Sequence, residues 1–274
     1  MTQEELAELL DVSVDAIGKY ERSVSFIRGD IEHRLASNLG WNCQEIMECR
    51  EDWESRQSSS GRRNYRVLEE VLVEELYDGS WLKASRAAIE MAQAELRPLP
   101  NGLEADIDVF LPIYETFRDH WGGIMLGNRM VAKWALPFLL PEQEARFRAG
   151  QLIEAELSVD LIRRAILPGS YFGYCPALII RPGHEGASSL LLSSFVRFLE
   201  AVAERDVLLH GLGSVSVSPS GAQICKDLGM VRLGSHCLDA SFGIWELPGA
   251  AVSGSVFGRR SAMARRKYAE ADGR

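Results

Sequence analysis

Two glutamates in the segment GQLIEAELS, Glu154 and Glu156, have the residue type and spacing for proton transfer. A strand would present these alternate side chains on one face, where a carboxylate can act as a general base. The same spacing is common on solvated strand faces, and that interpretation stays open. His184 lies between two glycines and could contact a phosphate or act as a base, although a lone loop histidine often does neither.

Other catalytic patterns do not stand out in the sequence. It shows no Ser-His-Asp order, Walker phosphate loop or metal cluster, and we expect no bound metal. The cysteines have neither a CxxC pair nor histidine spacing suited to zinc, so we expect them to be reduced and mostly structural. They are Cys43, Cys49, Cys175, Cys225 and Cys237.

Charge and hydropathy restrict the function classes. The 274 residues carry a net charge of -9, which is the wrong sign for a protein that coats nucleic acid without specificity. No run of about 18 apolar residues occurs, and the N-terminal stretch MTQEELAELL is acidic and amphipathic. We therefore expect a cytoplasmic protein with no membrane partner.

The elements that must position these residues fall into several segments. Short helical periods over residues 1–53 are followed at 54–64 by a polar linker containing ESRQSSSGRR. Residues 65–100 predict a helical connector of two helices, broken at 78–80. Residues 251–274, with GRR and ARRKY, predict a basic flexible tail.

Residues 101–250 predict a mixed α/β domain, because strand and helix patterns alternate there. An amphipathic helix is expected at 105–120, and two strands flank a short turn at 127–129. Further helices are expected near 141–149, 158–166, 187–203 and 220–228. Further strands are expected at 174–180, 212–217 and 242–247.

The N-terminal segment begins with a capping box. Thr2 can accept a hydrogen bond from the backbone of Glu5, whose carboxylate can return to the amide of Thr2. A second helix restarts after Asp11-Val12-Ser13, with Ser13 as its N-cap. The small and apolar residues are spaced as two closely crossing helices require. They are Ala7, Val12, Ile17 and Tyr20.

TQEELAELLDVSVDAIGKYER resembles the helix-turn-helix of phage-repressor or XRE-type regulators, and RLASNLGW resembles a later helix of those domains. The turn position that is usually glycine is Asp11, and the helix that normally precedes the motif is missing. The resemblance implies that the second helix enters the major groove of DNA, with Gln3 at a phosphate. The residues placed near DNA are Ser13, Val14, Asp15, Gly18, Lys19 and Arg22.

Most of residues 105–248 resembles the GNAT acyltransferase fold, through the segments beginning NRMVAKWALPFLL, YCPALIIRPGHEG and SVSPSGAQICKDLG. The resemblance implies a loop whose amides hold the pyrophosphate of coenzyme A before a helix. Its candidates are Gly183, His184, Gly186 and Ala187. Pro182 and Glu185 replace the usual Gln or Arg and the first glycine, and Cys225 stands where the family often has a tyrosine general acid.

Together these patterns predict an α plus α/β protein: an all-α helix-turn-helix domain followed by a mixed α/β GNAT-like domain. The favoured function is a sequence-specific transcriptional regulator whose GNAT-like domain is a non-catalytic sensor or interaction domain. Its expected partners are double-stranded DNA, a second copy in a homodimer and the transcription machinery. The alternative is an active N-acyltransferase using acetyl-CoA or another acyl-CoA, with Glu154, Glu156 and Cys225 as catalytic candidates. A scaffold without DNA contact is a third possibility.

Overall fold

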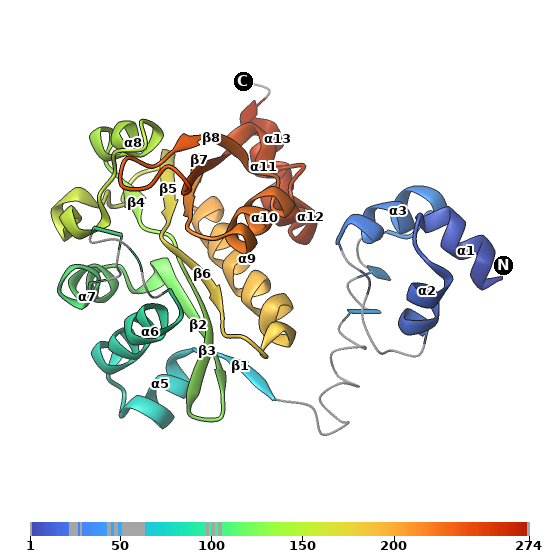
Figure 1. Cartoon of the computed structure of the whole chain (residues 1–274), viewed down its shortest axis with the longest axis horizontal. Helices are drawn as coiled ribbons and strands as arrows, with labels where there is room; N and C mark the ends of the chain where they lie inside the picture. The colour runs from blue at the N-terminus through green and yellow to red at the C-terminus, as the bar shows by residue number, and fades with distance from the viewer. Residues whose placement is uncertain are drawn as a thin grey trace. The chain divides into compact units, whose positions relative to one another are not determined.

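The computed structural model describes residues 2–21, 27, 29–42, 45–46, 49–50, 64–96, 99, 102–103 and 106–272. The chain divides into two compact units, Met1–Asn64 and Tyr65–Arg274. Both appear in Figure 1, with the first unit in blue. The boundary lies at the end of the predicted linker, although most of that linker falls outside the described residues.

The first unit contains helices α1 (Gln3–Leu10), α2 (Val14–Glu21) and α3 (Gly29–Leu39). The predicted capping box is confirmed, because the Thr2 and Glu5 side chains each bond the other's backbone amide. Asp11 ends α1 in a left-handed conformation with φ of 52°, which aspartate tolerates better than most residues. The buried side chains that hold the helices together are Ala7, Leu10, Ile17, Ile31 and Leu35.

The turn between α1 and α2 is fixed by α3. The guanidinium of Arg34 donates hydrogen bonds to the carbonyl oxygens of Leu10 at 2.7 Å and Asp11 at 3.2 Å. Ser13 accepts a hydrogen bond from the amide of Ala16 at 3.1 Å, which confirms its predicted capping role. The backbone carbonyl groups at the end of α1, which have no hydrogen-bond partner within the helix, therefore accept hydrogen bonds from Arg34.

The second unit is built on two sheets. One has the order β1 (Tyr65–Val67), β2 (Trp121–Leu126), β3 (Arg129–Ala135), β6 (Ala177–Ile180). The other has the order β4 (Phe138–Leu139), β5 (Gly169–Cys175), β7 (Val207–Ser216), β9 (Gly243–Pro248), β8 (Val231–Ser235). The β2–β3 hairpin confirms the predicted turn at 127–129.

One predicted strand is divided between these sheets. We expected a single strand over 174–180, whereas β5 ends at Cys175 and β6 begins at Ala177. Pro176 lies between them and has no backbone N–H to donate to a ladder. The chain leaves the five-stranded sheet at this proline and joins β3 of the four-stranded sheet.

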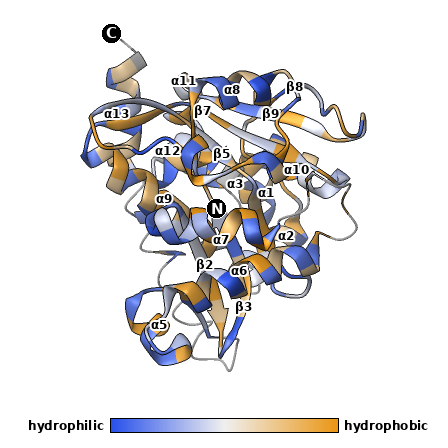
Figure 2. Cartoon of the chain, turned by 90° about the vertical axis from the view of Figure 1, so that its left-hand side faces the viewer, coloured by the Kyte–Doolittle hydropathy of each residue, from blue (hydrophilic) through white to orange (hydrophobic). Residues whose placement is uncertain are grey.

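Helices cover both faces of the sheets. The helices are α5 (Glu70–Tyr77), α6 (Trp81–Glu95), α7 (Ile107–Thr116), α8 (Pro141–Arg148), α9 (Ser188–Glu204), α10 (Pro219–Asp227), α11 (Gly249–Val252), α12 (Val256–Arg260) and α13 (Ala262–Asp272). Figure 1 shows α6 and α7 on one side of the strands and α9 on the other. Figure 2 shows α8 as largely hydrophilic, as its sequence PEQEARFR requires of a surface helix.

Each face has its own apolar core. One forms around Phe110, Ile113 and Phe147, and the other around Phe195 and Leu199 of α9. The run Glu185–Glu204 is long and apolar enough to cross a membrane by length and composition, and half of its most apolar window is buried in this unit. Burial of this kind is usual for the core helix of a globular domain.

Three further sequence expectations about the second unit are wrong. Residues 65–100 are not a separate connector, because β1 joins the sheet and α6 packs against β3 and β6. Residues 251–272 are not a flexible tail: α11, α12 and α13 dock on the unit through buried Phe257 and Tyr268. The helix expected at 158–166 is only a 3-10 turn at Val159–Leu161.

Candidate active site

The strands of the second unit separate to form a fork. β5 and β7 run parallel and stay paired as far as Cys175 and Ser214. Beyond that point β6 pairs with β3, whereas β7 continues to Ser216 beside β9. β6 is the last strand of its sheet, so strand edges of β6 and β7 face the fork without a ladder partner among the described strands.

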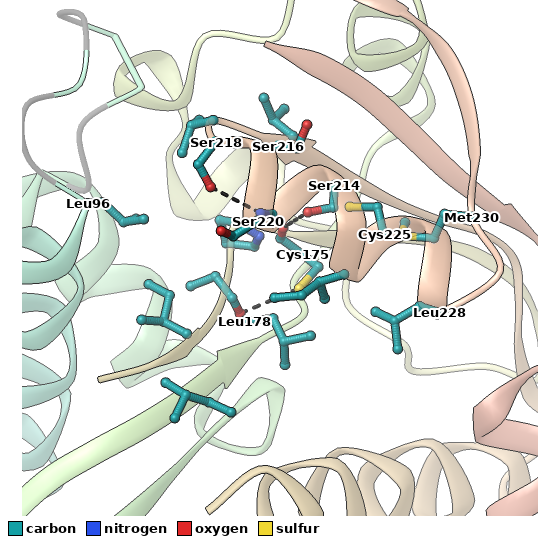
Figure 3. A pocket seen from close by; sticks show the side chains of 18 of the residues that line it. Leu96, Cys175, Leu178, Ser214, Ser216, Ser218, Ser220, Cys225, Leu228 and Met230 are labelled. Carbon is teal, nitrogen blue, oxygen red and sulfur yellow. Dashed lines mark hydrogen bonds between the residues drawn. The ribbon is translucent and has the colours of Figure 1, made fainter. Parts of the chain in front are cut away.

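A cavity of about 230 Å³ lies at this fork. Figure 3 shows β6 on one side of it, the serines of β7 and α10 on another, and Leu96 of the α6 segment at one end. Most lining side chains are apolar, and Glu154 is the one charged residue among the described residues that line the cavity. The walls are Leu96, Leu99, Leu103, Glu154, Cys175, Pro176, Ala177, Leu178, Ile179, Ile180, Leu192, Phe195, Leu212, Ser214, Val215, Ser216, Val217, Ser218, Ser220, Gly221, Ile224, Cys225, Leu228, Met230 and Phe257.

The serines along this wall mostly have internal partners. Ser214 donates to the carbonyl oxygen of Cys175 at 2.9 Å, Ser216 accepts from the indole of Trp245 at 2.8 Å, and Ser218 caps α10. None of these three bonds joins a serine to a histidine or a carboxylate. A serine nucleophile needs such a base, so these hydroxyls serve the fold around the cavity.

Glu154 is buried at the cavity wall. It lies in a 3-10 turn, Glu154–Glu156, and not on the strand that the sequence predicted. Its carboxylate accepts a hydrogen bond from the phenol of Tyr174 on β5. Burial raises the pKa of Glu154 to about 7, against the opposing effects of the Tyr174 hydrogen bond and the charge of Lys133. A carboxyl group with this pKa can exchange a proton near neutral pH.

Glu156 faces away from this environment. It is exposed and forms an ion pair with Arg146 at 2.6 Å. The two glutamates therefore do not act as a pair on one face, and only Glu154 belongs to the site. The turn that carries them rotates successive side chains, unlike the alternation of a strand.

Two further ionisable residues, Lys133 and Tyr114, interact electrostatically with Glu154, and sequence reasoning missed both. Lys133 of β3 is fully buried and donates to the hydroxyl of Tyr114 at 2.9 Å. Burial lowers the pKa of Lys133 to about 7, although Cys175 and Glu154 oppose that shift. Lys133 pairs across the sheet with Ile179, which lines the cavity. A lysine within an apolar strand was the available signal.

The two cavity cysteines are poor nucleophiles. Burial raises the pKa of Cys175 to about 12 and that of Cys225 to about 11. Both thiols are free and stay protonated near neutral pH, whereas the thiolate is the reactive form. Cys225 does reach the cavity, as its sequence position suggested, but as a buried neutral thiol. Cys43 lies outside the described residues.

The predicted phosphate loop does not line the cavity. Gly183 adopts φ of 77°, a conformation that favours glycine, and its amide donates to the carboxylate of Glu185 at 2.8 Å. His184 contacts the hydroxyl of Tyr65 at 3.3 Å. Gly186 and Ala187 lie in the 3-10 turn that leads into α9, and Ala187 is buried. The Glu185 carboxylate therefore already accepts the hydrogen bond of the Gly183 amide, a backbone donor that a bound phosphate would need.

The residues assigned to DNA are only partly exposed. Val14, Asp15 and Lys19 of α2 reach the surface, but the Lys19 ammonium pairs with Asp15 at 2.6 Å. Gly18 is buried among the helices, so its assignment to a DNA contact is wrong. Gln3 donates to the carboxylate of Glu21. Ser13 caps α2, and Arg22 lies outside the described residues.

Among the described residues, no group of three or more His, Cys, Asp or Glu side chains is placed to hold a metal ion.

Comparison with known proteins gives limited likenesses. No protein-family model matches the chain, and no curated protein matches it, so neither resemblance gains support from sequence. A GNAT-family acetyltransferase from Streptococcus pneumoniae is similar in structure, with 12% identity, a TM-score of 0.39, and coverage of 68% of this chain and 99% of that one. An N-acyl amino acid synthase from uncultured soil microbes has 12% identity, a TM-score of 0.42, and coverage of 74% and 100%.

Proposed function

We propose that the Tyr65–Arg274 unit is an acyltransferase that moves an acyl group from a thioester, such as an acyl-CoA, to an amine. The observation that carries this proposal is the buried carboxyl of Glu154 on an apolar cavity at the fork between β6 and β7. A secluded carboxyl with a pKa near 7 suits proton transfer during aminolysis of a thioester.

The fork supplies a place for the thioester arm. An extended ligand with amide groups can add to an open strand edge through main-chain hydrogen bonds. The edges of β6 and β7 that face the fork have this character. In this arrangement the arm of the donor lies along the strands, and its acyl end enters the cavity beside Glu154.

The proposed chemistry needs one proton acceptor and no covalent enzyme intermediate. A neutral amine, formed when the substrate ammonium loses a proton to water, attacks the thioester carbonyl carbon through its nitrogen, and the ionised carboxylate of Glu154 takes a proton from that nitrogen. Cleavage of the carbon–sulfur bond releases a thiolate, which receives the proton back from Glu154. The products are an amide and a thiol. The raised pKa values of Cys175 and Cys225 favour this direct transfer over transfer through a cysteine.

A matched pair of variants tests this function. Release of free thiol from acyl-CoA is measured in the presence of a panel of primary amines. Glu154→Gln removes the proton acceptor while its amide oxygen still accepts from Tyr174, and we expect a rate at least about 100-fold lower. Glu156→Gln, two residues away and exposed, is expected to retain the wild-type rate. Equal rates for wild type and Glu154→Gln would refute the proposed base.

We also propose that the Met1–Asn64 unit binds double-stranded DNA through α2. The support is local: two helices joined by a short turn, with exposed Val14 and Asp15 at the start of the second. The test is to sequence DNA crosslinked to wild type and to the double variant Lys19→Ala, Arg22→Ala. Discrete palindromic sites that the variant loses would support DNA binding and a homodimer, whereas no enrichment with wild type would contradict DNA binding.

A further inference from the structure

The cavity is larger than a two-carbon acyl group requires. An engineered protein cavity of about 150 Å³ already binds benzene, a six-carbon ligand. The cavity at the fork measures about 230 Å³. An acetyl group would leave most of this apolar surface in contact with water, and a longer apolar ligand would gain free energy by covering it.

The walls are suited to a hydrocarbon. Leu96, Leu99 and Leu103 come from the segment after α6, and Leu192 and Phe195 come from α9. Among the described residues that line the cavity there is no lysine, arginine or histidine. Aliphatic and aromatic walls with few polar groups are typical of sites for apolar ligands.

We infer that this cavity binds the hydrocarbon chain of an acyl donor longer than acetyl, with roughly eight to ten carbons as the upper limit that its volume sets by comparison with the benzene-binding cavity. This inference rests on the proposed acyltransferase function and names its donor class. The chain of an acyl donor is apolar along its whole length. An amine acceptor arrives charged and hydrated, and burying that charge away from Glu154 would be unfavourable.

A chain-length series tests the inference. Saturated acyl-CoA thioesters of 2 to 14 carbons are titrated into the full-length protein, and dissociation constants are measured by calorimetry. Each methylene that enters the cavity should tighten binding about fourfold. The gain should stop once the chain fills the space that the donor's arm leaves, at no more than roughly eight to ten carbons. Affinity that does not depend on chain length would overturn the inference.

A cavity-filling variant localises the effect. Ile224 of α10 lines the cavity and is 44% exposed, so a larger side chain there can be accommodated at the surface. Ile224→Trp is expected to weaken decanoyl-CoA binding at least about tenfold and to weaken acetyl-CoA binding much less. Leu192→Trp, from the α9 wall, should act in the same direction. Ile166→Trp is the control, because Ile166 is 79% exposed and lies outside the cavity lining.

The outcomes separate this inference from the proposed function. If free fatty acids bind more tightly as their chains lengthen, and if Ile224→Trp weakens that binding, the cavity is supported as the binding site of the hydrocarbon chain. A lack of thioester turnover would then count only against the proposed acyltransferase function. Turnover of acetyl-CoA at the same efficiency as octanoyl-CoA would agree with the acyltransferase function but would overturn the inference that the cavity binds a longer hydrocarbon chain. Competition of apolar amines with fatty acids for the cavity would assign it to the acceptor and also overturn the inference.

Discussion

The phenol of Tyr174 donates a hydrogen bond to the carboxylate of Glu154, linking β5 to a 3-10 turn that is 20 residues away in the sequence. Both side chains are buried. A donated hydrogen bond stabilises the ionised carboxylate, whereas burial favours its neutral form. The balance leaves Glu154 with a pKa of about 7, and several predictions depend on that balance.

The rate of acyl transfer should rise with pH and level off above pH 7. Glu154 must be ionised to accept a proton, and its pKa of about 7 sets the midpoint of the rise. Tyr174→Phe removes the hydrogen bond that favours the carboxylate and should move the midpoint to higher pH. Tyr171→Phe is the control, because its hydroxyl bonds the carbonyl oxygen of Leu167 instead. A midpoint unchanged by Tyr174→Phe would exclude Glu154 as the titrating base.

Lys133 should act on the same midpoint through its charge. Its ammonium lowers the pKa of Glu154 by electrostatic attraction, so Lys133→Met is expected to move the pH–rate midpoint upward. Methionine has a similar volume and is often tolerated in place of a buried charge. Lys226→Met on the exposed face of α10 provides the comparison. A lower rate with an unmoved midpoint would show that Lys133 only maintains the structure.

Glu154 should make the protein less stable as pH rises from about 4.5 to 7. Its pKa is raised from 4.5 to about 7 on folding, so within this window the folded state keeps a proton that the unfolded state loses. The stabilisation is complete below the lower value and is lost as pH passes the higher one, with an amplitude of up to about 3 kcal/mol. Urea unfolding of wild type and Glu154→Gln should differ in slope across this window; parallel curves would contradict the raised pKa.

Removing the Glu185 carboxylate should strengthen binding of coenzyme A nucleotides. The carboxylate accepts the hydrogen bond of the Gly183 amide and would repel a pyrophosphate nearby. Glu185→Ala should tighten acyl-CoA binding and leave binding of an acyl-pantetheine, which lacks the pyrophosphate, unchanged. Glu204→Ala, at the far end of α9, should affect neither. An equal gain for both ligands would show that the loop does not face the nucleotide.

Arg34 should stabilise the first unit more than a surface cation does. Its guanidinium satisfies the carbonyl oxygens of Leu10 and Asp11 at the turn. Arg34→Met leaves them without that donor and should cost about 1–3 kcal/mol. Hydrogen exchange of the α1 and α2 amides measures this change. Lys19→Met, which removes only an exposed ion pair with Asp15, should have little effect. Equal hydrogen-exchange protection in the two variants would show that the hydrogen bonds of Arg34 do not stabilise the turn.

The sequence by itself determined the elements whose causes are local. The capping box at Thr2, the Ser13 cap and the hairpin at 127–129 depend on residues within a few positions of each other, so short-range patterns identify them. The long helix at 187–203 followed from its own apolar periodicity and corresponds to α9 within one residue at each end.

The tertiary structure alone decided the site. Glu154, Tyr174, Lys133 and Tyr114 lie on four different elements, and no periodic pattern relates residues so far apart in the chain. Their proton affinities arise from burial and from one another's charges, which exist only after packing. The fork also depends on which strand β6 pairs with. Pro176 interrupts the first strand ladder, but the position of β3 in the folded unit determines where β6 pairs next.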